Sequence, residues 1–211
     1  MIPRIIIKYN RFLDPIFADW VKNQPKFKGV NIPTHGQVLK RVKKYNKLWS
    51  KNGDMILKAL TKSTGLSFKR NQIEVHVVSV NSRSFSSPIV LKSGCSSIDF
   101  INILTHELIH CLFVDNCDRV NRHIPWNQKV EGYNVGNDHI FLHAFLKYIY
   151  LDVLKSPRHL KQNLIVSRKS GNEEYSRAWD VVEEFSYKEL IREFGSRVKG
   201  SKEQHKINNN K

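Results

Sequence analysis

Residues 96–112 read SSIDFINILTHELIHCL, and the pattern within this segment decides the fold of the region around it. Its apolar residues recur at the spacing of a helix, so that they line one face. A serine, Ser96 or Ser97, precedes the first of them and can accept a hydrogen bond from the free amides of a helix start. We therefore predict a helix whose core-facing residues are Ile98, Ile101, Leu104, Leu108, Ile109 and Leu112.

The same predicted helix carries the motif His106-Glu107-Leu108-Ile109-His110. Histidines four positions apart project from the same side of a helix, so His106 and His110 can bind one Zn²⁺ ion together. Glu107 stands next to the first ligand, where it can reach a water molecule that the ion makes acidic. We expect one zinc ion per chain, with Glu107 as the catalytic general base.

This motif is the signature of the zincin metallopeptidases, and the chain resembles that group from about Ile73 to Leu154. The resemblance implies hydrolysis of peptide bonds in a protein or peptide substrate. It also implies that the strand before the motif helix lies along the cleft and pairs with an extended substrate. Residues 84–91 would form that edge.

A zincin needs a third protein ligand, and the best candidate is His139, which begins a second predicted helix after a long polar segment. A histidine in that place is similar to the third ligand of the SprT-like zincins, which implies a set of His106, His110 and His139. His143, one turn further along, is an alternative ligand, or could stabilise an oxyanion or orient a ligand. The remaining candidates are His123, Glu131, Glu173, Glu174, Glu183 and Glu184.

The segments around the motif helix predict an α+β fold with a small sheet and several packing helices. A capping box, Thr34-His35-Gly36-Gln37, begins a helix that we expect to stop at Asn52-Gly53, and a shorter helix follows over residues 55–60. Residues 73–80 are strand-like, and residues 88–91 predict a second strand at the sheet edge, where Pro88 is tolerated. Further helices are predicted over residues 138–154 and 172–194, the latter with Tyr175 at core spacing.

The positive charge is concentrated near the N-terminus. The net charge is +16, and residues 1–72 contribute +13 of it, through 16 Lys and Arg against three Asp. Such a surface is either a solvated helix face or one that attracts nucleic acid. The densest run consists of Lys40, Arg41, Lys43, Lys44, Lys47 and Lys51.

We divide the chain into a basic helical region (1–72), packed on or part of the same domain as a zincin-like core (73–196), and a basic flexible tail (197–211). With 211 residues, 40% of them hydrophobic, the chain can bury a core. No segment approaches the roughly 20 apolar residues that span a bilayer, and the first residues do not resemble a signal peptide. Three cysteines, an odd number, fit a reducing compartment. We expect a cytoplasmic protein with no membrane partner.

Three functions fit these features. The first is a zinc-dependent metallopeptidase. The second is the same enzyme held on nucleic acid by residues 1–72, as the likeness to SprT-like proteases implies. The third is a non-catalytic nucleic-acid-binding module that zinc stabilises. Glu107 favours an enzyme, because a purely structural zinc site has no use for a carboxylate beside its first ligand.

Overall fold

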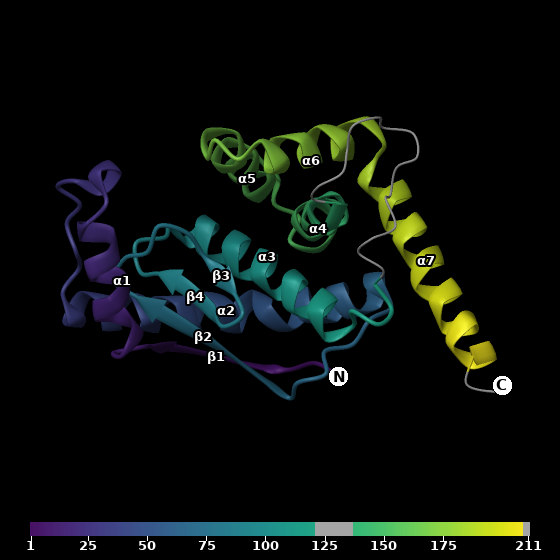
Figure 1. Ribbon diagram of the computed structural model, residues 1–211, viewed down its shortest axis with the longest axis horizontal. Helices are drawn as coiled ribbons and strands as arrows, with labels where there is room; N and C mark the ends of the chain where they lie inside the picture. Colours follow the sequence, from purple (N-terminus) through teal and green to yellow (C-terminus); the bar gives the residue numbers. More distant parts are fainter. Residues whose placement is uncertain (121–136, 209–211) are drawn as a thin grey trace.

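The computed structural model describes residues 1–120 and 137–208, and within them it confirms the α+β fold, with seven α-helices and one small sheet (Figure 1). In chain order the elements are β1 (Arg4–Tyr9), α1 (Leu13–Lys22), the 3-10 turn η1 (Pro25–Phe27), α2 (His35–Thr64), β2 (Gln72–Val78), β3 (Phe85–Ser86), β4 (Ile89–Lys92), α3 (Ser97–Asp115), α4 (Asn137–Tyr148), the π-helical turn η2 (Ile149–Val153), α5 (Pro157–Lys169), α6 (Glu173–Glu184) and α7 (Tyr187–Asn208).

The sheet has the strand order β1-β2-β4-β3. β2 pairs in parallel with β1 on one side and with β4 on the other, and β3 runs antiparallel to β4. The prediction that residues 88–91 form an edge strand is therefore wrong, because β4 lies inside the sheet and the two-residue β3 takes the edge. Pro88 precedes β4, so it removes no hydrogen-bond donor from the β4 ladder.

β1 is absent from the predicted elements, although it holds the run Ile5-Ile6-Ile7. It becomes a strand by pairing with β2, with Ile7 opposite Val75, so its partner lies far along the chain. Residues 1–72 thus contribute a strand to the sheet that precedes the motif helix. α2 packs on β1 and β2, and α3 packs on β3 and β4.

α2 begins at the predicted capping box, in which Thr34 and Gln37 exchange hydrogen bonds. It then runs without interruption to Thr64, so the predicted break at Asn52-Gly53 is wrong. Gly53 is buried directly against the indole of Trp49, where no larger residue fits. This packing outweighs the roughly 1 kcal/mol that glycine costs in a helix interior.

α3 is the buried helix at the centre of the molecule, between the sheet and the C-terminal helices (Figure 1). Ser96 caps it by accepting a hydrogen bond from the amide of Asp99. Phe100 stacks on Tyr45 of α2 with ring centroids 4.1 Å apart. Among the described residues, α3 is the one helix long and apolar enough to cross a bilayer. However, 61% of its most apolar 18-residue stretch is buried inside the protein, as in the core helix of a soluble protein.

The C-terminal half differs from the predicted pattern in four places. α4 ends at Tyr148 and continues as η2, whereas one helix was expected over residues 138–154. α5, which starts at Pro157, was not expected at all. The helix expected over residues 172–194 is divided into α6 and α7 at Ser186, whose φ of 63° lies outside the helical region. α7 extends to Asn208, so residues 197–208 continue a helix into the region predicted as a tail.

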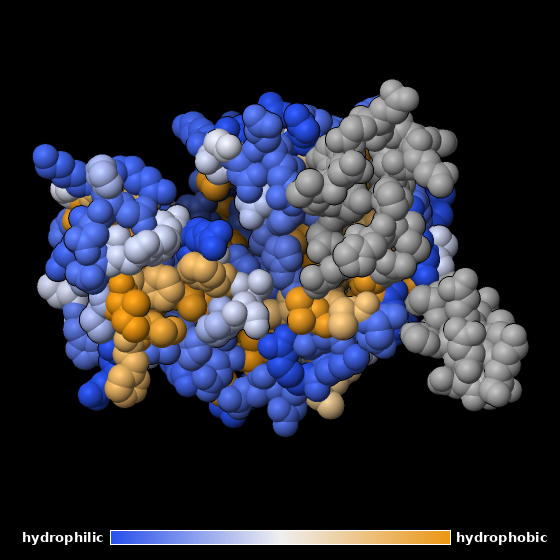
Figure 2. All heavy atoms as spheres, viewed as in Figure 1, coloured by the Kyte–Doolittle hydropathy of each residue, from blue (hydrophilic) through white to orange (hydrophobic). Residues whose placement is uncertain are grey.

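Two surface features belong to the N-terminal region. All six residues of the dense basic run are exposed along α2. Phe12, Ile16 and Trp20 remain exposed on α1 and its N-terminal flank, with 75, 64 and 42% of their surface accessible. Figure 2 shows hydrophobic surface near α1 and a recess between the part of the molecule that carries α1 and the part that carries α5.

Candidate metal centre

Three histidines from two helices meet beside the cleft. His106 and His110 lie one turn apart on α3, with their Nε2 atoms 3.1 Å apart. The ligand atoms of His106, His110 and His139 all lie within 4.8 Å of one another. Two nitrogens that bind one zinc ion tetrahedrally at 2.0–2.1 Å are about 3.3 Å apart, close to the spacing on α3. This group could therefore hold a metal ion.

His139 lies near the start of α4, and Glu174 at the start of α6 orients its ring. The Nδ1 atom of His139 is 2.5 Å from Glu174 Oε1. A neutral imidazole that donates its Nδ1 hydrogen to a carboxylate keeps a lone pair at Nε2. The Nε2 atom of His139 is buried and has no hydrogen-bond partner among the described residues. An unpaired buried nitrogen beside two further imidazoles is the state expected of a metal ligand.

His106 is held in the form that binds metals. Burial lowers the pKa of His106 well below its usual value, and the charges of His110, His139 and His143 lower it further. An imidazole must be neutral to offer a lone pair to a metal. The environment of α3 therefore keeps this first ligand ready for binding at neutral pH.

The other predicted ligands do not join this group. Glu174 touches His139 instead of replacing it. Glu173 pairs with Arg177 on α6, and Glu183 lies near Arg168 of α5. Glu184, at the end of α6, is also outside the group of ligand atoms. His123 and Glu131 lie outside the described residues.

Glu107 points into the same cleft as the histidines and is only 7% exposed. Burial raises the pKa of its carboxyl group to about 7. A carboxylate is destabilised where water cannot solvate it, so Glu107 both binds and releases a proton near neutral pH. These are the properties that a general base and acid needs.

His143, the alternative third ligand, lies one turn after His139 but belongs to a different environment. Its ring stacks on Trp179 of α6 with centroids 4.5 Å apart, and the residue is 1% exposed. Burial lowers the pKa of His143 well below its usual value, followed by the charges of His139 and His110. The ring centroid is 5.9 Å from that of His139, and its Nδ1 is also buried without a hydrogen-bond partner among the described residues. His143 is nevertheless outside the group of three histidines whose ligand atoms lie within 4.8 Å of one another.

Tyr175, whose helical spacing predicts a core residue, lies at the site instead. Its ring lies 4.6 Å from the His139 ring and 5.7 Å from the His106 ring, and it lines the cleft. Burial and then the charges of Glu107 and Glu174 raise the pKa of its hydroxyl, whereas the charge of Arg83 lowers it. Helical spacing could not reveal this role, because the same spacing serves a core residue and a residue at the edge of a cleft.

The histidine group opens on a cleft of about 570 Å³. One wall is the chain from Asn81 to Ser87, which includes the edge strand β3, and the opposite wall comes from α5 and α6. The recess in Figure 2 lies between these two parts of the molecule. A cleft of this size holds several residues of a peptide, with the histidines and Glu107 at its floor.

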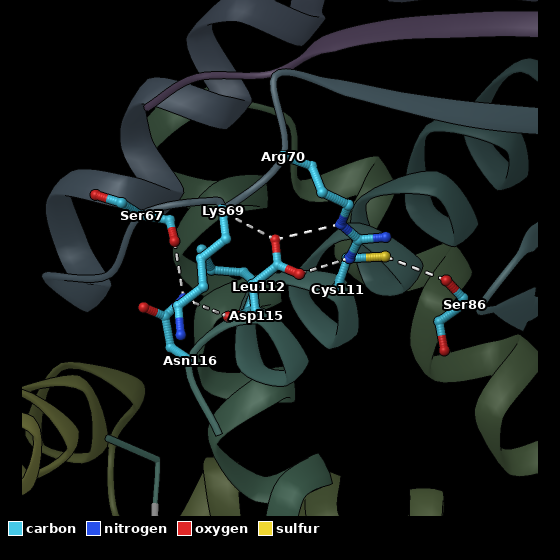
Figure 3. Close-up of polar contacts among 8 residues, drawn as sticks. All are labelled: Ser67, Lys69, Arg70, Ser86, Cys111, Leu112, Asp115 and Asn116. Carbon is cyan, nitrogen blue, oxygen red and sulfur yellow. Dashed lines mark hydrogen bonds and ion pairs between the residues drawn. The ribbon is translucent and has the colours of Figure 1, made fainter. Parts of the chain in front are cut away.

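A polar cluster holds the edge strand at a fixed distance from α3 (Figure 3). The thiol of Cys111 donates a hydrogen bond to the carbonyl oxygen of Ser86 in β3 at 3.2 Å. Burial raises the pKa of Cys111 to about 11, so the thiol keeps the proton that this bond requires. The Arg70 guanidinium binds Asp115 on the next turn of α3 at 2.8 Å. Cys111, the residue after His110, thereby links the motif helix α3 to the cleft wall.

Comparison of the chain with protein-family models, with curated proteins and with solved structures gives no match.

Proposed function

We propose that the protein is a zinc-dependent metallopeptidase of the zincin type. The observation that carries this proposal is the Nε2 of His139, buried and without a partner among the described residues, beside the His106 and His110 pair, with Glu107 in the same cleft. Within residues 1–120 and 137–208 the group comprises three imidazole nitrogens and no fourth protein ligand, as is typical of catalytic zinc sites, which keep one position open. The three free cysteines favour a cytoplasmic location.

A zinc ion bound there would acidify a water molecule and polarise the carbonyl group of the scissile bond. Glu107 accepts a proton from the attacking water at its carboxylate, and its raised pKa allows it to hold that proton. It then donates the proton to the nitrogen of the leaving amine, which restores the carboxylate. Glu174 keeps the His139 ring in the required tautomer throughout.

The edge strand β3 supplies a place for the substrate backbone. β3 pairs with β4 on one side, and its residues line the cleft. The resemblance to zincins implies that an extended peptide pairs with this edge, so that its scissile bond passes over the histidines. The predicted substrate edge, residues 84–91, narrows in this proposal to β3 and its flanks, because β4 is paired on both sides.

The first test is elemental analysis of the purified protein together with hydrolysis of a fluorogenic peptide library. We expect about one zinc ion per chain in the wild type and a reduced content in His110→Ala and His139→Ala. Glu107→Gln should keep its zinc and lose hydrolysis, because it retains the fold but has no base. His35→Ala, an exposed histidine of α2, serves as the control and should change neither property.

Several outcomes would contradict the proposal. A wild type that binds no metal removes the enzyme hypothesis. If the three histidines bound a different metal, the proposed site would stand and only the identity of the ion would change. Zinc that persists in His139→Ala would mean that another residue is the third ligand. If Glu107→Gln still hydrolysed peptides, a residue other than Glu107 would be the general base.

The basic face of α2 favours nucleic acid as a second partner. Its six cations are exposed, and α2 lies outside the cleft lining, so nucleic acid and peptide could be bound together. Fluorescence anisotropy with a labelled oligonucleotide should show an affinity that falls steeply between 50 and 200 mM salt. The loss should be about tenfold for every few phosphates that the Lys and Arg side chains contact. Neutralising Lys40, Lys43, Lys44 and Lys47 to Gln should abolish it, whereas unchanged affinity would contradict this role.

A further inference from the structure

The charges that line the cleft are unbalanced. Among the described lining residues Glu107 is the only carboxylate, and Arg83 and Lys92 are cationic. This inference rests on the proposed function, in which the Glu107 carboxylate accepts and donates a proton. A divalent ion on the histidines would make the cleft still more positive. The site therefore attracts a negative group on its substrate.

Arg83 stands at the wall of this cleft in a defined conformation. It belongs to the segment between β2 and β3, two residues before Phe85. Its guanidinium carbon lies 5.1 Å from the centre of the Phe85 ring. A guanidinium that rests on an aromatic ring keeps its N–H groups available for a carboxylate and loses little freedom when it binds one.

The Phe85 ring, on which the Arg83 guanidinium rests, is held in place by two contacts. Phe85 pairs with Val90 in the sheet, so its backbone is part of the edge strand. Its ring lies 5.7 Å from that of Phe17 on α1. Arg83 itself lies in the bend between β2 and β3, but the ring on which its guanidinium rests belongs to a strand of the sheet. A residue that determines specificity needs such support.

Arg83 lines the same cleft as Glu107 and the three histidines. Its positive charge also lowers the pKa of the Tyr175 hydroxyl, which burial and then the charges of Glu107 and Glu174 raise. The Tyr175 ring lies 4.6 Å from that of His139. A group bound by Arg83 would thus lie in the cleft that holds the bond on which Glu107 and the histidines would act.

No carboxylate within residues 1–120 and 137–208 lies at ion-pair distance from Arg83, which is exposed. Four other arginines do have a described acidic neighbour, namely Arg70, Arg168, Arg177 and Arg197. In the described structure, the donors of Arg83 that face the cleft are available to a ligand.

We propose that Arg83 is a specificity-determining residue that binds a substrate carboxylate, so that the cleft prefers peptides with an anionic group close to the scissile bond. The carboxylate belongs either to an Asp or Glu side chain or to the C-terminus of the substrate. Both sources present the same planar pair of oxygens, which the guanidinium binds through two parallel hydrogen bonds.

The test compares two fluorescein-labelled decapeptides of one sequence that carry either two central glutamates or two central glutamines. Binding to the non-hydrolysing Glu107→Gln protein is measured with and without zinc. We expect the glutamate peptide to bind about 10- to 100-fold more tightly, the range of a charge-assisted hydrogen bond. Adding Arg83→Gln should bring this ratio close to one, and adding Arg83→Lys should leave it intermediate because the charge remains.

The matched control is Arg11→Gln. Arg11 also lies over an aromatic ring, at 5.2 Å from the centre of Phe12, but it does not line the cleft. The Arg11→Gln substitution should leave the ratio of the two peptide affinities unchanged.

Repeating the comparison with free and amidated C-termini assigns the source of the carboxylate. A preference that follows the terminus indicates exopeptidase binding, and one that follows glutamate indicates an internal side chain.

Equal binding of the two peptides by the parent protein would overturn the proposal, as would a ratio that survives in Arg83→Gln. Hydrolysis by the wild type is measured on the same peptides. A protein that discriminates between them in binding but cleaves neither would contradict the peptidase function and leave the anion site in place. Cleavage of both at equal kcat/KM would support the peptidase function and reject the role of Arg83.

Discussion

Glu174 accepts a hydrogen bond from Nδ1 of His139 at 2.5 Å, and this contact fixes the tautomer and the direction of the third imidazole. The carboxylate comes from α6, whereas the histidine belongs to α4, so the contact also joins the two helices. Groups that orient a metal ligand in this way affect affinity almost as much as the ligand itself. At the scale of the residue, Glu174 is thus part of the proposed metal centre, where it would orient a ligand without touching the ion.

We expect Glu174→Ala to weaken zinc binding by about 10- to 100-fold, because the His139 ring then loses its orientation and its preferred tautomer. Competition between the protein and a chromophoric chelator measures this affinity. Glu173→Ala is the control, since Glu173 is an exposed neighbour that pairs with Arg177 on its own helix. Equal affinities for the two variants would show that Glu174 does not support the site.

Tyr175 lines the cleft beside the His139 ring, and in the proposed peptide hydrolysis its hydroxyl would stabilise the oxygen that becomes negative. We expect Tyr175→Phe to lower kcat by about 100-fold, the effect of removing one hydrogen-bond donor from such a position, with little change in KM or zinc content. Tyr187→Phe removes a hydroxyl that binds Asp152 and should leave kcat unchanged. A loss confined to KM would instead indicate a role in substrate binding.

At the scale of the element, the length of α2 depends on one close contact. A Cβ atom at Gly53 would lie 2.5 Å from Nε1 of Trp49, whose ring is buried. The absence of a side chain at Gly53 leaves room for the indole, and the helix continues to Thr64. The glycine serves packing and does not end the helix.

Gly53→Ala should therefore destabilise the protein by about 1–3 kcal/mol, although alanine has the higher helix propensity. Gly36→Ala, in the first turn of the same helix, meets no atom within 4 Å and should be neutral or stabilising by up to about 1 kcal/mol. Urea denaturation followed by circular dichroism gives both values. If the two substitutions had the same sign, the contact with Trp49 would not control α2.

At the scale of the whole molecule, the cleft depends on the docking of α5 against α3. His159 of α5 and Asn102 of α3 are bonded twice, through Nδ1 of His159 to Oδ1 of Asn102 at 2.6 Å and through Nδ2 of Asn102 to the His159 carbonyl oxygen at 3.0 Å. Burial lowers the pKa of His159. The neutral ring is thus the form that the folded protein prefers.

This shift predicts a loss of stability in acid. The unfolded chain binds a proton at His159 near pH 6.5, whereas the folded protein binds it at lower pH, so stability is complete above about pH 6.5 and falls as the pH decreases toward the folded pKa. The melting temperature of the zinc-loaded protein should therefore fall between pH 7 and pH 5. His159→Gln should reduce this dependence, and His35→Gln should not. An identical pH slope in the His159 variant would refute the assignment.

The sequence by itself determined the parts of this protein that local interactions specify. The serine cap and apolar spacing of α3, the capping box of α2 and the pair of histidines with Glu107 all depend on residues within one or two helical turns. The α+β class also follows from such local patterns. His139 could be named because a histidine at the start of a second helix resembles the third ligand of the SprT-like zincins, and the structure brings it to the other two histidines.

Only the tertiary structure decided the contacts between segments far apart in the chain. β1 forms by pairing with β2, Glu174 reaches His139 across 35 positions, and Tyr175 and Arg83 line one cleft although they are far apart in the chain. Tertiary contacts also made two predictions wrong. Burial of Gly53 against Trp49 outweighed the local preference of glycine for a helix break, and β3 paired with the strand after Pro88, so that this strand is not at the edge. Packing energy depends on which surfaces meet, and no local pattern records that.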